Sequence, residues 1–151
     1  MHCASRWIVN YCVKHNIGTL VIGKNDGWKQ KSDMHKIINQ IFTQIPYESF
    51  LGKLEYKCKE TGIDLVKTEE AYTSGTSFLD NELPIKENYN KSRRVYRGLF
   101  KSNNGEYINA DVNGAFQIMR KVFSNVKANE IVGAGSHPVV VNIPLQTANV
   151  I

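Results

Sequence analysis

The sequence predicts an α/β domain built around a parallel sheet. Short apolar runs of strand length alternate with segments in which apolar residues recur at every third or fourth position, the spacing of a helix face. The joins between these segments are short, and a helix–strand–helix–strand order with short joins favours parallel strands. With 151 residues, 42% hydrophobic and 22% charged, the chain has the size and composition of one folded globular domain.

The first half of the chain supplies most of the predicted helices and strands. Apolar residues between positions 4 and 12 predict a helix, which Asn16 and Gly18 end. The run Thr19–Gly23 is continuously apolar, which is typical of a strand buried on both faces. A polar loop, two helical stripes separated by Pro46 and a second strand follow, at residues 24–36, 37–45, 50–62 and 63–68.

The second half is more irregular. Residues 72–90 are rich in Ser, Asn, Gly and Pro and predict a loop. Residues 94–101 and 106–109 predict a hairpin, because Asn104 and Gly105 supply the positive φ angles of a tight turn. A helix over residues 113–123 closes the domain, and the tail after it contains one strand-like run at 139–143.

Composition narrows the compartment and the partners. No apolar run approaches the length that spans a bilayer, and residues 1–6 lack the layout of a secretory signal. Cys3, Cys12 and Cys58 form no C-x-x-C pair, so we expect free thiols and a cytoplasmic location. The net charge of +5 is compatible with a phosphate-backbone partner, although charge alone does not decide this.

Asp111 stands at the most informative place in the chain. Apolar and β-branched residues approach it, and a helical apolar pattern follows at once through Ala115, Ile118, Met119 and Val122. Capping and the helix dipole both favour a carboxylate at a helix N-terminus. An ordinary N-cap role therefore explains Asp111 by itself, and a ligand role needs further support.

Nine short stretches in a fixed order supply that support. Together they resemble the C-terminal part of the TnpB/OrfB proteins of insertion sequences, which are transposon-encoded, RNA-guided DNA nucleases related to the type V CRISPR effectors. No single stretch is specific, whereas their ordered conjunction is. The stretches are Thr19–Asn25, Trp28–Gln30, Asn39–Gln40, Ile45–Pro46, Leu54–Lys57, Glu70–Ser74, Ser77–Asp80, Arg97–Phe100 and Asn109–Ala115.

The resemblance implies a partial RNase H-like (RuvC-type) domain. It assigns residues 1–72 to the second part of the nuclease domain, 73–107 to an inserted target-nucleic-acid-binding region, 108–124 to the final RuvC-like helix and 125–151 to a C-terminal tail. Many relatives carry two C-x-x-C pairs, a zinc ribbon, in the inserted region. This chain has no cysteine after Cys58, so we expect a loop and hairpin subdomain in place of the ribbon and no structural zinc.

Nucleases of this type hold two Mg²⁺ ions with about three carboxylates, because hard Mg²⁺ prefers oxygen ligands. Asp111 matches the family's final Asp. The strand end at Gly23 and Lys24 lacks the usual middle Glu, and the resemblance makes Glu70, at the end of the next strand, the candidate in its place. Glu69 is the alternative, and two solvated acids leading into a loop explain the pair equally well.

The family's first Asp lies on a strand that this sequence does not contain. At most two of the three carboxylates are then present, so we do not expect this chain alone to cut DNA, and its status as an enzyme stays open. The resemblance implies guide RNA, DNA and the missing N-terminal part of the same domain as partners, and no membrane.

Basic side chains interleaved with aromatic rings are candidate contacts to a nucleic-acid backbone. A solvated basic face is the ordinary alternative. The candidate contacts are Arg93, Arg94, Arg97 and Lys101, which flank Tyr96 and Phe100, and Lys29 beside Trp28.

Three interpretations of the whole chain follow. It is a C-terminal fragment of such a nuclease, a catalytically inactive nucleic-acid-binding remnant, or an unrelated small α/β protein.

Overall fold

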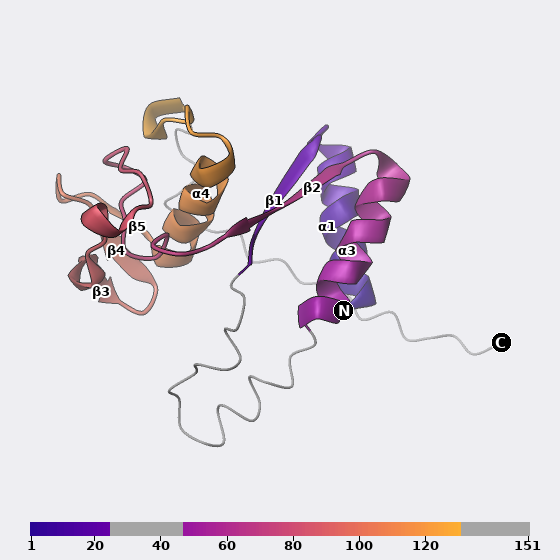
Figure 1. The fold of residues 1–151 in the computed structure, drawn as a ribbon, viewed down its shortest axis with the longest axis horizontal. Coiled ribbons are helices and arrows are strands. Elements are labelled where there is room, and N and C mark those ends of the chain that lie inside the picture. The colour runs from indigo at the N-terminus through magenta and orange to yellow at the C-terminus, as the bar shows by residue number, and fades with distance from the viewer. Residues whose placement is uncertain (25–46, 131–151) are drawn as a thin grey trace, which may run out of the picture. The chain divides into compact units, whose positions relative to one another are not determined.

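The computed structural model describes residues 1–24 and 47–130, whose elements are labelled in Figure 1. These residues fall into two compact units. The first comprises residues 1–20 and 47–66, and the second comprises residues 21–24 and 67–130. Within these ranges, no helix combines the length and the apolar character that crossing a membrane requires.

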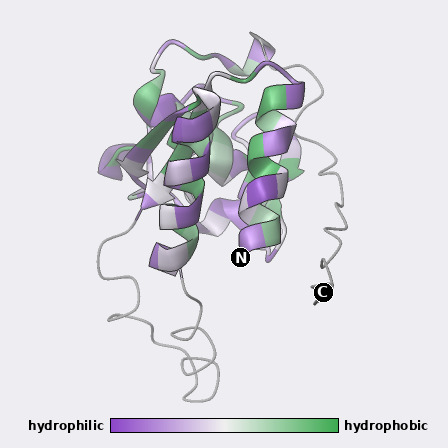
Figure 2. Ribbon diagram, turned by 90° about the vertical axis from the view of Figure 1, so that its right-hand side faces the viewer, coloured by the Kyte–Doolittle hydropathy of each residue, from purple (hydrophilic) through white to green (hydrophobic). Residues whose placement is uncertain are grey.

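The first unit is a pair of packed helices, α1 (His2–Lys14) and α3 (Tyr47–Thr61). Figure 2 shows hydrophobic and hydrophilic residues alternating along the helices, as expected where one face is buried and the other is solvated. Both helices confirm the sequence prediction. The buried apolar residues of the pair are Val9, Cys12, Leu51, Leu54 and Cys58.

A buried lysine joins the two helices. Lys57 of α3 is 2% exposed, and its Nζ donates to Ser5 Oγ at 2.6 Å and to the His2 carbonyl at 2.9 Å. Burial lowers the pKa of Lys57, because the ammonium loses its hydration.

Both helices end in the same way, with a residue in the left-handed conformation. After α1, Asn16 has φ +53°, and the Ile17 amide donates to the Cys12 carbonyl at 2.8 Å. After α3, Gly62 has φ +73°, and the Ile63 amide donates to the Cys58 carbonyl at 2.9 Å. These are Schellman motifs, which stop a helix and satisfy its last carbonyls.

The two strands that follow these helices pair with each other. β1 (Thr19–Lys24) and β2 (Asp64–Glu69) are hydrogen-bonded neighbours, and the Asp64 amide donates to the Gly18 carbonyl at 2.9 Å. The strands therefore begin side by side. Gly23, near the end of β1, lies beside Glu70, which follows β2, so the strands are parallel as predicted. All six residues of β1 are only half-buried, so the prediction of burial on both faces was wrong; β2 is the only strand paired with it among the described residues.

The second unit contains a three-stranded antiparallel sheet and the helix α4 (Ala110–Val122). The predicted hairpin is present, with Lys101 opposite Tyr107. The predicted strand over 94–101 is divided in two, because the chain reverses at Arg97 and Gly98. The strands are β3 (Arg94–Tyr96), β4 (Leu99–Lys101) and β5 (Tyr107–Asn109), in that order across the sheet.

The hairpin loop uses one left-handed residue rather than two. Gly105 has φ +85°, whereas Asn104 is not among the residues with positive φ. The Ser102 amide donates to the Glu106 carbonyl at 2.8 Å, and the Gly105 amide donates to the Ser102 carbonyl at 3.2 Å. This three-residue loop ending in a left-handed glycine is a common hairpin connection.

The core of the second unit lies between its sheet and α4. The rings of Phe78 and Phe116 stack there with centroids 4.6 Å apart. The buried cluster consists of Phe100, Ile108 and Ala110, with Leu79, Val112 and Phe116 packed against it.

Several sequence predictions fall outside the described residues. These are Lys29, the loop at 25–36, the helical stripe at 37–45, the strand-like run at 139–143, and the stretches Trp28–Gln30, Asn39–Gln40 and Ile45–Pro46.

Candidate metal and nucleic-acid site

Asp111 lies in the first turn of α4, but it does not cap the helix. The N-cap is Asn109, whose Oδ1 accepts hydrogen bonds from the amides of Asp111 at 2.9 Å and Val112 at 3.1 Å. The helix thus begins earlier than the predicted residue 113. The N-cap interpretation of Asp111 is therefore wrong, and its carboxylate is available for another role.

The Asp111 carboxylate faces solvent. Its side chain is 85% exposed, and within the described part of the chain it pairs with Arg94, whose Nη2 lies 3.3 Å from Asp111 Oδ1. The same guanidinium also donates to the Arg97 carbonyl at 2.9 Å, which holds the turn between β3 and β4. An exposed pair of this kind contributes at most about 1 kcal/mol, so a competing cation can open it.

Glu70 lies against the end of β1. A Cβ atom built on Gly23 would stand 3.1 Å from Glu70 Cβ and 3.2 Å from Glu70 Oε2, and 2.7 Å from Ile118 Cδ1 of α4. A side chain at position 23 would therefore displace the end of the Ile118 side chain and crowd Glu70, whose carboxylate lies beside Gly23. Glu70 is half-buried, whereas Glu69 is exposed, as expected for neighbours that point to opposite faces.

Ile118 lies close to Gly23, as Glu70 does, and it belongs to the same helix, α4, as Asp111. Residues seven apart share one helix face, and two turns of helix span about 10 Å. Two bridged metal ions about 4 Å apart, each with oxygens at about 2 Å, reach across roughly 8 Å. Asp111 thus shares a face of α4 with Ile118, and Ile118 in turn lies close to Gly23.

The donor chemistry suits Mg²⁺, but the set is partial. Both candidates offer carboxylate oxygens, the ligands that hard cations take. Residues 1–24 and 47–130 contain no cluster of three acidic, histidine or cysteine side chains placed to hold a metal ion. Two carboxylates fall short of the three that a two-metal site of this type uses.

Of the predicted basic contacts, Arg93 is held internally. Its Nη1 pairs with Glu82 Oε2, and the two side chains are only 16% and 15% exposed. Arg97 and Lys101 are exposed. Arg93 therefore stabilises the second unit, and of the predicted contacts that the structure describes, Arg94, Arg97 and Lys101 are exposed and can face a phosphate backbone.

The outer face of the β3-β4-β5 sheet combines these charges with aromatic rings. Phe100 and Ile108 point into the core, so their strand neighbours point outward. Tyr96 is 72% exposed and Tyr107 is 54% exposed, and Lys101 Nζ lies 5.7 Å from the centroid of the Tyr107 ring. Solvent-facing tyrosines beside basic groups suit stacking with bases and contact with phosphates.

Sequence reasoning missed Glu82, whose side chain joins three segments. Its Oε2 accepts from the Ser77 amide at 2.8 Å and from Arg93, and its Oε1 accepts from Asn103 Nδ2 at 2.9 Å. Burial raises the pKa of Glu82, but the bonds from Arg93, Ser77 and Asn103 outweigh it and hold the pKa below its ordinary value near 4.5. Glu82 has no sequence motif, so only its spatial partners reveal this role.

Sequence reasoning also misjudged the buried face of α4, which is polar. Asn113, Gln117 and Arg120 are at most 2% exposed, whereas Ala115 of the predicted apolar pattern is exposed. Asn113 bonds to the Phe78 amide and the Thr76 carbonyl, each at 2.9 Å, and Gln117 Nε2 donates to the Glu82 carbonyl at 3.1 Å. A spacing of Asn, Gln and Arg at positions i, i+4 and i+7 is the signal that was available.

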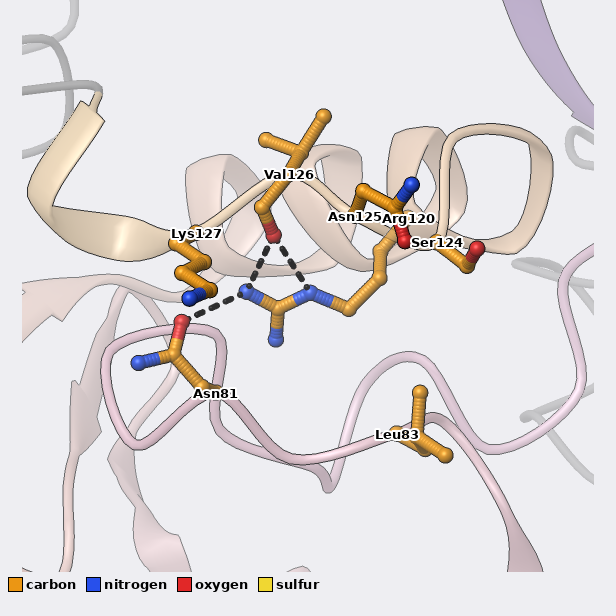
Figure 3. Close-up of a pocket in the computed structure, with 7 residues that line it drawn as sticks. All are labelled: Asn81, Leu83, Arg120, Ser124, Asn125, Val126 and Lys127. Atoms are coloured by element: carbon orange, nitrogen blue, oxygen red, sulfur yellow. Dashed lines mark hydrogen bonds between the residues drawn. The ribbon is translucent and has the colours of Figure 1, made fainter.

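Arg120 is a buried cation that has no carboxylate partner among residues 1–24 and 47–130. Figure 3 shows its guanidinium bonded to the Val126 carbonyl and to Asn81 Oδ1, at 3.0 and 3.1 Å. It also donates to the carbonyls of Glu82 and Phe78, and it lies 4.1 Å from the centroid of the Phe78 ring. Burial lowers the pKa of Arg120. Arg120 of α4 thus binds backbone carbonyls of the loop that follows β2.

Comparisons with known proteins support the broader part of the resemblance that the motifs suggest, a relationship to RNA-guided nucleases. The Cas12f1-like, TNB domain family model matches residues 47–118. A Cas12f1 chain, in the cryo-EM structure of the Cas12f1-sgRNA-target DNA complex, is similar with a TM-score of 0.59 and 25% identity, over 78% of this chain and 32% of that one. This chain therefore spans about a third of that relative's length. The comparison with curated proteins gives no match. The two similarities relate this mixed α/β chain to the Cas12f1/TnpB type of RNA-guided nucleases.

Proposed function

We propose that this chain forms part of an RNA-guided, Mg²⁺-dependent DNA endonuclease of the TnpB/OrfB type, encoded by an insertion sequence. Asp111 and Glu70 are two of its metal ligands, and a further carboxylate comes from outside these 151 residues. Bound Mg²⁺ supplies activation of water and stabilisation of the leaving oxygen. By itself the chain binds nucleic acid and does not cut it.

The observation that supports this proposal most strongly is the closeness of the Glu70 side chain to Gly23 at the end of β1. A strand end that carries glycine cannot itself bind a metal, and the neighbouring strand delivers a half-buried carboxylate to the same place. A solvated acid leading into a loop would not require a glycine opposite it. Glu70 rather than Glu69 is therefore the proposed ligand.

The same proposal assigns the outer face of the β3-β4-β5 sheet to guide RNA or target DNA. Arg97 and Lys101 provide charge there, and Tyr96 and Tyr107 provide rings. The polar network around Glu82 holds this region together in the interval where many relatives carry a zinc ribbon, and the proposal includes no zinc.

The decisive test restores the missing carboxylate. The chain is joined to the upstream RuvC-type strands of a related nuclease, and cleavage of a matched DNA target is measured with guide RNA and Mg²⁺. We expect cleavage that falls at least about 100-fold in Asp111→Asn and in Glu70→Gln, because each variant loses a charged ligand. Glu69→Gln is the matched control and keeps activity. Unchanged cleavage in Glu70→Gln would remove Glu70 from the site.

A second variant tests the role of Gly23. Gly23→Ala forces a methyl group against Glu70 and Ile118, so we expect the carboxylate to move and activity to fall about tenfold or more. Gly114→Ala in α4 is the control, because nothing lies within 4 Å of the added methyl group. Equal activity in the two variants would contradict the proposed place of Glu70.

A second candidate function is a catalytically inactive nucleic-acid-binding protein. The ion pair between Arg94 and Asp111 favours it, since a guanidinium already balances the carboxylate. This candidate predicts that the joined protein binds guide RNA and DNA but cuts neither in Mg²⁺, and that Asp111→Asn leaves binding unchanged.

A further inference from the structure

A shallow depression of about 510 Å³ opens beside Glu70. It is lined by Glu70, Ala71, Tyr72, Thr73, Ser74 and Tyr89, all within the second unit. Its volume falls in the range of small-molecule sites in proteins. The two rings meet edge to face, with centroids 5.9 Å apart and planes inclined by 70°.

Both tyrosines present part of their rings to solvent. Tyr72 is 41% exposed and Tyr89 is 38% exposed, although each makes the contact just described. Neither belongs to the buried cluster of the unit. The pair therefore offers aromatic surface at the mouth of the depression.

The backbone holds Tyr72 in an unusual conformation. Its φ of +65° lies in the left-handed region, which bulky side chains rarely adopt. The Thr76 hydroxyl donates to the Tyr72 carbonyl at 2.9 Å, and the Thr73 hydroxyl donates to the Glu70 carbonyl at 2.7 Å. Glycine or asparagine would suit this φ better, so the ring is kept at a conformational cost, a pattern that marks functional sites.

Tyr89 is fitted over a glycine. A Cβ atom on Gly75 would come within 2.5 Å of the Tyr89 ring, so only glycine lets the ring lie there. The Asn90 amide donates to the Gly75 carbonyl at 2.9 Å and fastens the two segments together. The depression is thus built from two loops that are fixed to each other.

We propose that Tyr72 and Tyr89 hold a base of a single-stranded nucleic acid, and so position the adjoining phosphate near Glu70. This inference rests on the proposed function and adds a positioning site to it. The segment 86–101, which contains Tyr89, carries six basic residues and one acidic residue. Arg93 and Arg94 pair with Glu82 and Asp111, and the other four basic residues are exposed and attract a polyanion. Stacking on tyrosine accepts any base, as a strand-positioning site requires.

The test measures binding of the 151-residue chain to a short fluorescein-labelled thymidine oligonucleotide by anisotropy at low salt. A second oligonucleotide of equal length with abasic sites carries the same phosphates without bases. We expect the wild type to prefer the base-bearing strand. Tyr72→Ala and Gly75→Ala, which displaces Tyr89, should each lose about tenfold in affinity for that strand and little for the abasic strand.

Three further variants separate stacking from folding. Tyr72→Phe keeps the ring and should bind like the wild type. Tyr72→Gly relieves the left-handed φ, so its Tm should hold or rise while the preference for bases is lost. Tyr56→Ala removes a tyrosine of the first unit that is 42% exposed, and should change nothing.

The outcomes distinguish the two proposals. Binding that Arg97→Ala and Lys101→Ala weaken, but that the tyrosine variants leave unchanged, overturns the base site and keeps the proposed function. Equal affinity of the wild type for the base-bearing and abasic strands also overturns the base site. No binding to either strand overturns both proposals.

Discussion

Asn109 and Asp111 have different roles at the start of α4. Asn109 satisfies the first amides of the helix, and Asp111, two residues later, has its carboxylate in solvent. The sequence places both residues at a helix start but does not say which of them caps it. Asn and Asp are equally good N-caps, so only the observed hydrogen bonds decide.

This division predicts unequal effects of substitutions at the two positions. Asn109→Ala should lower the free energy of unfolding by about 1 kcal/mol, because two amides lose their acceptor. Asp111→Ala should change it by less than about 0.5 kcal/mol, since the side chain is exposed. Urea unfolding followed by circular dichroism measures both. A larger loss in Asp111→Ala than in Asn109→Ala would contradict the assignment of the cap.

At the scale of elements, the inserted region is held by polar contacts from several directions. Glu82 connects the loop after β2, the helical turn that carries Arg93 and the hairpin that carries Asn103. Its own carbonyl accepts from Gln117 and Arg120 of α4. Because these contacts converge on one residue, the segments are expected to lose their order together.

Glu82 makes the stability of this region depend on pH. Its folded pKa lies below its unfolded value near 4.5, so its contribution is complete above that value and is lost as pH falls through the folded pKa. Glu82→Gln should cost about 2–3 kcal/mol at neutral pH, since the partners lose a charged acceptor. Thermal melts of both proteins from pH 7 to pH 3 should show the difference in Tm shrinking below pH 4.5. A constant difference would contradict this role.

For the whole molecule, the order of elements followed from the sequence to a large extent. The helices α1 and α3 and both strands of the parallel pair were predicted from apolar spacing and from Asn16 and Gly62. The division of residues 94–101 was not, because Arg97 and Gly98 are a weaker turn signal than an Asn-Gly pair. The polar face of α4 was also missed, since periodicity methods count apolar residues and this helix buries Asn113, Gln117 and Arg120.

The candidate site was predictable in part. Asp111 and Glu70 were named from motifs, and their surroundings then came from the structure: the glycine opposite Glu70 and the ion pair on Asp111. The internal position of Arg93 could not be predicted, because its partner Glu82 lies eleven residues away in a loop without regular structure.

The charge of the whole chain leads to a prediction about salt. Because the chain has a net charge of +5, the logarithm of its binding constant for single-stranded DNA should fall linearly with the logarithm of salt concentration. Replacing Arg97 and Lys101 by alanine should lower the slope by about 0.7 for each lost phosphate contact. Arg93→Ala serves as the comparison, because its guanidinium is paired inside the protein; it should reduce Tm more than it reduces the salt slope. Anisotropy titrations over a range of salt concentrations measure these slopes.

The matching C-terminal ends of α1 and α3 also determine where β1 and β2 begin. Each left-handed residue is followed by a strand, and the two strands begin side by side. Because β1 and β2 are both six residues long, their last residues also lie side by side. Side chains alternate along a strand, so parity alone selects which of two consecutive glutamates turns toward Gly23. An insertion of one residue within β2 would place Glu69 beside Gly23 instead of Glu70, whereas an insertion of two would place Thr68 there and move Glu70 about 7 Å further along.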